Sequence, residues 1–251
     1  MNGGHSIETG SPHAPREVLI FHGYTGDPEE FRELAEMLAA RLDAHVFVPL
    51  LPGHGKSEKD LLSTSFDELV DSALSHVEHT ASFGKQFVLI GNSFGGLLAI
   101  LATAKHMPAA LVLSVTPYKT RFPFSIPGMG YALHLRRFWN KTPHMSQREL
   151  RARKHLPFYS HAPGISLSLI NEGRHRARDI VPHITCPILS INAEYDPIVH
   201  PTSGITLLAH SGNNPLNTHV MLPHHPHRVF FGSGHEEAEQ LVFEFLEHIL
   251  Q

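Results

Sequence analysis

A serine between glycines is the feature of this sequence most able to carry out chemistry. Residues 91–96 are Gly-Asn-Ser-Phe-Gly-Gly, with an apolar segment before them and a second apolar segment after them. The spacing Gly-x-Ser-x-Gly between a strand and a helix is typical of a tight turn that exposes a serine hydroxyl above a sheet edge. Glycines suit this turn because the strand and helix backbones come too close for a Cβ atom. We therefore predict that Ser93 is a nucleophile.

A serine hydroxyl is a weak nucleophile, so it needs a general base and an acid that orients this base. Asp196 is the candidate acid, because it closely follows an apolar segment expected to form a strand. Glu194 lies two residues nearer to that strand and is the alternative. The candidate bases are the histidines that follow the acid in the chain: His219, His224, His225, His227, His235 and His248. Chain order does not choose among them.

The elements that must position these residues follow from alternating apolar segments. Strands are expected over residues 18–21, 45–50, 86–90, 110–115, 187–192 and 218–222, and helices over residues 27–42, 66–78, 93–105 and 236–250. Strands that alternate with helices are parallel, and the crossover connections cover both faces of the sheet. The predicted fold class is therefore α/β, with a mostly parallel sheet of six or more strands.

The overall composition favours one folded domain. The chain has 251 residues, of which 41% are hydrophobic and 18% charged, which excludes intrinsic disorder. The first fifteen residues lack the basic start and apolar core of a secretory signal. The single cysteine, Cys186, cannot form an internal disulfide, so nothing indicates an oxidising compartment. We expect a cytoplasmic protein with a mobile N-terminal tail over residues 1–16.

Histidine is unusually frequent, with 22 residues against 20 lysines and arginines together. These histidines are scattered along the chain and form no His-Glu-x-x-His zinc motif, and the chain offers no pair of cysteines. The sequence also holds no phosphate-binding loop of the Walker type and no dinucleotide fingerprint. We therefore expect no metal and no cofactor.

Residues 117–182 interrupt the alternation and differ in charge from the rest of the chain. Between residues 117 and 180, twelve basic residues stand against three acidic ones, a net charge of +9. The whole chain carries −4, so the remainder carries −13. The length of this segment, and its aromatic residues between Phe122 and Trp139, predict a cap or lid over an apolar site. Its charge favours an anionic ligand or transient contact with a membrane surface, and the alternative is internal pairing with the acidic body.

Together these motifs resemble those of the α/β-hydrolase superfamily, above all the small bacterial carboxylesterases and monoacylglycerol lipases. Besides the serine turn, the resemblance rests on His-Gly-Tyr-Thr-Gly at residues 22–26, Pro-Gly-His-Gly at residues 52–55 and Asp-Pro-Ile-Val at residues 196–199. It implies that the backbone N–H groups of Tyr24 and Phe94 form an oxyanion hole. It also favours Asp196 as the acid, and it implies a structural rather than a catalytic role for His54.

The resemblance also bears on the choice of base. In this superfamily the base lies in the loop after the last strand, within a Leu-Pro-x-Ser-Gly-His sequence. Alignment of residues 222–227 with this pattern places His227 at the base position. His235 stands in a Ser-Gly-His sequence at the start of the last helix and remains an alternative, as does His225, because His225-Pro226 replaces the usual Ser-Gly.

The predicted organisation is a hydrolase core, residues 17–116 and 183–251, with a cap formed by residues 117–182. The resemblance implies hydrolysis of carboxylic esters through an acyl-enzyme on Ser93. The expected ligand is a small acyl ester or lipid-like molecule, with an anionic head group slightly favoured, and not a nucleic acid. Acyl transfer, thioester cleavage and ligand binding without turnover are the alternatives, and no oligomeric state is predicted.

Overall fold

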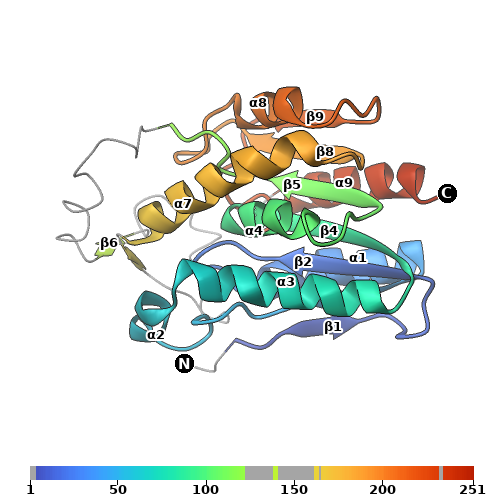
Figure 1. The fold of residues 1–251 in the computed structure, drawn as a ribbon, viewed down its shortest axis with the longest axis horizontal. Helices are drawn as coiled ribbons and strands as arrows, with labels where there is room; N and C mark the ends of the chain where they lie inside the picture. Colours follow the sequence, from blue (N-terminus) through green and yellow to red (C-terminus); the bar gives the residue numbers. More distant parts are fainter. Residues whose placement is uncertain (1–3, 122–137, 141–160, 164, 232–233) are drawn as a thin grey trace.

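A computed structural model describes residues 4–121, 138–140, 161–163, 165–231 and 234–251. Its centre is a seven-stranded sheet with helices on both faces (Figure 1). The strands lie in the order β1-β3-β2-β4-β5-β8-β9, and every neighbouring pair is parallel except β1 and β3. Their bounds are β1 Ile7–Thr9, β2 Arg16–Phe21, β3 Ala44–Val48, β4 Gln86–Asn92, β5 Ala110–Ser114, β8 Ile188–Ala193 and β9 Thr218–Leu222. The predicted α/β fold with a mostly parallel sheet is confirmed.

Helices on the two faces bury two separate apolar cores. Helices α1 (Arg32–Leu42) and α9 (His235–Ile249) cover one face, and α3 (Phe66–Ser82), α4 (Phe94–Thr103) and α7 (Ile165–Ile180) cover the other (Figure 1). Strand β4 serves both cores, since Val88 and Ile90 pack on the first face whereas Phe87 and Leu89 pack on the second. Such burial on both faces explains why the strands are continuous apolar runs rather than alternating ones.

Local signals set the ends of several helices. Asp27 accepts a hydrogen bond from the N–H of Glu29 and so caps a short 3-10 turn, Pro28–Phe31, that leads into α1. Ser65 and Glu68 form a reciprocal capping box at the start of α3, which runs four residues beyond its predicted end. Two short helices, α2 (Glu58–Ser63) and α8 (Ser203–His210), were not predicted from the sequence.

The predicted mobile tail over residues 1–16 needs a correction, because residues 7–9 form the edge strand β1. Ile7 is buried opposite Val48, and β1 pairs antiparallel with β3. His45 anchors this strand: its Nε2 lies 2.9 Å from a carboxylate oxygen of Glu8 and its Nδ1 lies 2.7 Å from one of Glu17. Three residues are too few for an alternating pattern to be recognised in the sequence.

The segment predicted as a cap, residues 117–182, is only partly described. It contains a strand pair, β6 (Phe138–Asn140) antiparallel to β7 (His161–Pro163), and then the sixteen-residue helix α7. Helix α7 packs on the core, because a Cβ on Gly173 would lie 3.0 Å from the Leu97 side chain of α4. Helix α7 therefore belongs to the layer of helices that covers the sheet together with α3 and α4. The prediction had placed it in the cap, because the cap was expected to extend to residue 182. The expected aromatic cluster between Phe122 and Trp139 lies outside the described residues except for the backbone of β6.

Among the described residues, no helix has both the length and the apolar character needed to cross a bilayer.

Candidate active site

Ser93 occupies the turn between β4 and α4, at the carboxyl edge of the sheet. Its backbone has φ 52° and ψ −119°, in the left-handed region that residues other than glycine rarely adopt. A backbone conformation of this kind costs on the order of 1–3 kcal/mol and persists only where the surroundings impose it. Here the N–H of Ser93 donates to the carbonyl oxygen of Ser114 on β5, 2.8 Å away, which helps to hold the turn.

A glycine after the serine allows the turn to sit close to the sheet. A Cβ on Gly95 would lie 2.1 Å from the carbonyl oxygen of Phe21, at the end of β2. No side chain fits at that distance, so the start of α4 can approach β2 only with glycine at this position. Steric crowding thus explains why glycine, and no larger residue, occupies this position of the Gly-x-Ser-x-Gly sequence.

Three side chains from distant parts of the chain form a hydrogen-bonded relay. The hydroxyl of Ser93 lies 2.9 Å from Nε2 of His227, and Nδ1 of His227 lies 2.6 Å from Oδ2 of Asp196. Asp196 is fully buried, whereas the His227 side chain is 19% exposed. With the proton of the neutral imidazole on Nδ1, Nε2 is free to accept the proton of the serine hydroxyl. This is the geometry of a serine activated by a histidine whose tautomer a carboxylate selects.

The backbone around Asp196 holds its carboxylate in place. Oδ1 accepts hydrogen bonds from the N–H groups of Ile198 and Val199, at 2.7 and 2.9 Å, which leaves Oδ2 for His227. The Arg121 guanidinium donates to the carbonyl oxygens of Asp196 and Glu194, at 2.5 and 3.2 Å. Arg121, at the start of the predicted cap, therefore holds the loop that carries Asp196. This contact was not predicted from the sequence.

The alternatives for the acid and for one base have other partners. Glu194 accepts a hydrogen bond from the backbone N–H of His224, 2.8 Å away. His225 lies with Nδ1 2.8 Å from the carbonyl oxygen of Pro223 and Nε2 2.9 Å from that of Gly234. His225 thus spans the loop between β9 and α9, and the structure does not bring it to Ser93.

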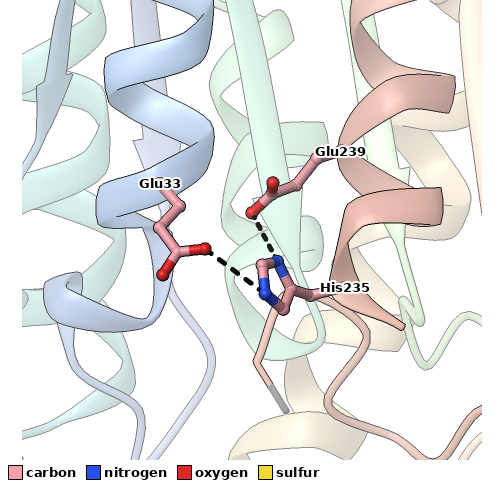
Figure 2. A group of neighbouring side chains, drawn as sticks. All are labelled: Glu33, His235 and Glu239. Atoms are coloured by element: carbon pink, nitrogen blue, oxygen red, sulfur yellow. Dashed lines mark ion pairs between the residues drawn. The ribbon is translucent and has the colours of Figure 1, made fainter. Parts of the chain in front are cut away.

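His235, the remaining alternative, lies at the first residue of α9 and faces helix α1. Figure 2 shows its imidazole between Glu33 and Glu239. Nε2 lies 3.3 Å from the Glu33 carboxylate and Nδ1 lies 3.1 Å from the Glu239 carboxylate. The structure therefore brings His227 to Ser93, and not His235.

The loop after β2 lies against Ser93. A Cβ on Gly23 would lie 3.3 Å from Cβ of Ser93, so a side chain here would crowd the nucleophile. The rings of Tyr24 and Phe94 pack edge to face with centroids 5.5 Å apart. Phe94 is the first residue of α4, where backbone N–H groups lack a partner within the helix. The two residues assigned to the oxyanion hole thus lie together beside Ser93.

Two buried histidines brace this loop against the loop after β3. Nδ1 of His22 lies 2.9 Å from the carbonyl oxygen of Gly23, and Nε2 accepts from the N–H of Leu51 at 3.1 Å. His54 accepts from the N–H of Thr25 at 3.2 Å, and its Nδ1 lies 2.9 Å from the carbonyl oxygen of Pro52. Both motifs were visible in the sequence, but only the folded chain shows that their histidines connect the two loops.

Acid should destabilise the protein through His22. Burial, reinforced by the charge of nearby His54, lowers the pKa of His22 from 6.5 to about 3. The unfolded chain takes up this proton near pH 6.5 and the folded chain does not, so stability is retained above pH 6.5 and falls as the pH decreases toward 3. One proton corresponds to about 1.4 kcal/mol per pH unit in the free energy of unfolding. Urea unfolding between pH 7 and 4 measures this slope.

The matched control for this prediction is His22→Gln, which cannot titrate. Other, partly buried histidines with a lowered pKa, such as His76 and His219, contribute equally to both proteins. The variant should therefore show a slope smaller than that of the original protein by about 1.4 kcal/mol per pH unit. Identical slopes for the two proteins would contradict the assignment to His22.

The sequence as a whole matches one family model. Residues 18–244 match the model described as the alpha/beta hydrolase family. The chain belongs to this family. Membership accounts for the parallel sheet, for the serine turn after β4 and for the chain order of Ser93, Asp196 and His227.

Individual relatives and one solved structure agree with the family assignment. The chain is 29% identical over 197 residues to a thermostable monoacylglycerol lipase of Bacillus sp. (strain H-257), a match that covers 74% of this chain and 73% of that lipase. It is 32% identical over 108 residues to ethanol acetyltransferase 1 of Kluyveromyces marxianus. The monoacylglycerol lipase of Paleococcus ferrophilus has the same fold, with a TM-score of 0.74, 20% identity and coverage of 97% of this chain and 98% of that one.

The acetyltransferase match is partial. It covers 42% of this chain and 29% of the acetyltransferase, so the chain spans less than a third of that relative's length.

Proposed function

We propose that this protein is a serine esterase that hydrolyses carboxylic esters through an acyl-enzyme on Ser93. The observation that carries the proposal is the relay in which Ser93 Oγ lies 2.9 Å from His227 Nε2 and His227 Nδ1 lies 2.6 Å from Asp196 Oδ2. The relatives described as lipases support the same class of reaction. A protein that only binds its ligand needs no such relay.

In the proposed reaction, Oγ of Ser93 attacks the ester carbonyl carbon while His227 takes the hydroxyl proton. The N–H groups of Tyr24 and Phe94 donate to the negative oxygen of the tetrahedral intermediate, an effect worth about 3–4 kcal/mol per donor in barrier height. When the intermediate collapses, His227 gives the proton to the departing alcohol. Water then attacks the acyl-enzyme with His227 again as the base, which releases the acid and restores Ser93.

The proposed substrate is a lipid-like acyl ester of the monoacylglycerol or lysophospholipid type. The monoacylglycerol lipase of Bacillus sp. supports this class, since the match covers almost three quarters of each protein. A panel of p-nitrophenyl esters of increasing acyl length, run beside monoacylglycerols, lysophospholipids and an acyl-CoA, tests the proposal. Turnover of esters that rises with acyl length is the expected result. Failure to hydrolyse any ester of the panel would refute the proposal.

Transfer of the acyl group to an alcohol is the second candidate activity. The match to ethanol acetyltransferase 1 is the observation that favours it. The same acyl-enzyme would then be attacked by an alcohol rather than by water. Product analysis in the presence of ethanol separates the two activities: free acid as the main product indicates hydrolysis, and ethyl ester as the main product indicates transfer.

Ionic strength should affect anionic substrates more than neutral ones. Residues 117–180 carry a net charge of +9, although Arg176 is paired with Asp67 and Glu172 at 2.9 Å each. Salt screens the attraction between these surface arginines and lysines and an anionic head group, over about 30 Å at 0.01 M and about 10 Å at 0.1 M. Between these two salt concentrations, kcat/KM for an anionic lysophospholipid should therefore fall by about threefold or more. A neutral monoacylglycerol with the same acyl chain is the control. Equal salt dependence for both substrates would rule out electrostatic recruitment.

A further inference from the structure

A group of acidic side chains surrounds His235 at the junction of α1 and α9 (Figure 2). Glu33 comes from the first turn of α1, and Glu236 and Glu239 come from the first turns of α9. Carboxylate oxygens of all three lie between 3.1 and 3.5 Å from a ring nitrogen of His235. None of these residues belongs to the relay of Ser93, so the group has no role in the proposed esterase reaction.

The imidazole lies close to the carboxylates of its acidic neighbours, and one of its ring nitrogens lacks a well-directed hydrogen bond. Nδ1 of His235 is buried and has no hydrogen-bond partner among the described residues, although Oε1 of Glu239 lies only 3.1 Å away. Two atoms at this distance that do not point at each other are arranged like two ligands of one ion, both of which point at the ion. A buried nitrogen without a partner costs stability unless something else binds it.

Glu239 is a second buried polar group in the same place. Its side chain is only 9% exposed, and it points toward His235 in Figure 2. Within the described residues, neither Glu33 nor Glu239 has a lysine or arginine within 4 Å, and the only histidine within that distance of either carboxylate is His235. A buried carboxylate normally requires a close positive charge.

We propose that Glu33, His235 and Glu239 bind one divalent metal ion, with Zn²⁺ as the best match. One atom from each of the three residues can be chosen so that all lie within 4.8 Å of one another. Zn–N and Zn–O bonds of about 2.0–2.2 Å place tetrahedral ligands about 3.3 Å apart. Binding therefore requires the exposed Glu33 carboxylate, which lies 3.3 Å from Nε2, to rotate toward an ion held between Nδ1 and Glu239. One imidazole with two carboxylates suits Zn²⁺, while soft thiolate-preferring ions and purely oxygen-preferring ions fit less well.

The neighbouring residues supply the remaining features of such a site. With Nδ1 on the ion and the Glu33 carboxylate turned from Nε2 toward the ion, Nε2 is left with Oε1 of Glu236, 3.5 Å away. Metal-binding histidines commonly donate their second N–H to a carboxylate, which orients the ring. Glu33 has an exposed side chain, so water can reach the ion and complete its coordination.

The ion would connect α9 to α1 next to the loop that carries His227. This loop already contacts the same part of the chain: Arg228 pairs with Glu30, and the rings of Phe230 and Phe31 lie 5.6 Å apart. A metal bound by Glu33 and His235 adds a third connection at the end of the loop. Binding of the ion is therefore expected to stabilise the folded protein without contacting Ser93.

The test uses the full chain after removal of metal with a chelator, and it does not depend on activity. One equivalent of Zn²⁺ should bind, and Zn²⁺ at a hundred times its dissociation constant should raise Tm by about 5 °C or more. Co²⁺ used as a spectroscopic substitute should give the strong visible absorption of a four-coordinate site. His235→Gln, Glu239→Gln and Glu33→Gln should each weaken binding by about tenfold or more.

His248→Gln is the matched control, because it removes another histidine of α9 that lies outside the group. It should bind Zn²⁺ like the original protein, which separates this site from weak binding by the many other histidines. Glu33 is exposed, so Glu33→Gln keeps the test decisive if the variants of the buried residues do not fold. An equal Tm rise in Glu33→Gln and the original protein, or the absence of binding at one equivalent, would overturn the proposal. Neither result would affect the proposed esterase reaction.

Discussion

Replacement of Ser93 by alanine is expected to reduce kcat/KM for every ester substrate by a factor of about 10⁴ or more. The physical reason is that only this hydroxyl lies within hydrogen-bond distance of Nε2 of His227 among the described residues. The variant should remain folded, because the substitution removes one oxygen and leaves the glycines that shape the turn unchanged. Esterase assays measure the first effect, and thermal unfolding measures the second.

Ser190→Ala is a suitable control for this prediction. Ser190 is also buried, on β8, and it takes no part in the relay. This variant should retain most of the esterase activity. Similar activity for Ser93→Ala and Ser190→Ala would show that Ser93 is not the nucleophile, whatever the stability of the two proteins.

Replacement of His227 by alanine is expected to lower kcat by about 10³-fold or more, because Ser93 then has no base to accept its proton. His235→Gln should keep most of the activity, since its imidazole lies between Glu33 and Glu239 on the side of α1. The two variants each remove a histidine from the same region, so kcat measured on one p-nitrophenyl ester compares them directly. A larger loss for His235→Gln than for His227→Ala would contradict the relay.

The serine turn could be predicted from the sequence because its signal is local. The glycines on each side of Ser93 are required by contacts within the turn and with β2, as the 2.1 Å approach at Gly95 demonstrates. Strand β4 and helix α4 are buried almost throughout, so their apolar character identifies them without knowledge of their neighbours. The fold class followed from the same property of the other strands.

The choice among the histidines could not be made from local signals alone. Chain order admits every histidine after Asp196, and only the register of the loop after β9 distinguishes them. In the structure β9 ends at Leu222, and His227 follows within the loop, whereas His235 begins α9. The superfamily pattern favoured His227 by this register, and the contacts with Ser93 and Asp196 depend on residues far apart in the chain.

Features that depend on distant partners were missed or assigned to the wrong unit. Strand β1 is recognisable only by its pairing with β3. Helix α7 carries several arginines, so its apolar face is narrow, and its place in the core depends on the contact of Gly173 with Leu97. The group around His235 combines residues from α1 and α9 that no sequence motif connects.

Covalent labelling with a fluorophosphonate tests the central claim most directly, because the reagent reacts with a serine that a histidine activates. The proposed mechanism predicts one label per chain, located by peptide mass spectrometry on Ser93, with loss of esterase activity in proportion to labelling. Labelling should be absent in Ser93→Ala and strongly slowed in His227→Ala. Full esterase activity in protein labelled at Ser93, or inactivation by a label on a different serine, would contradict the mechanism.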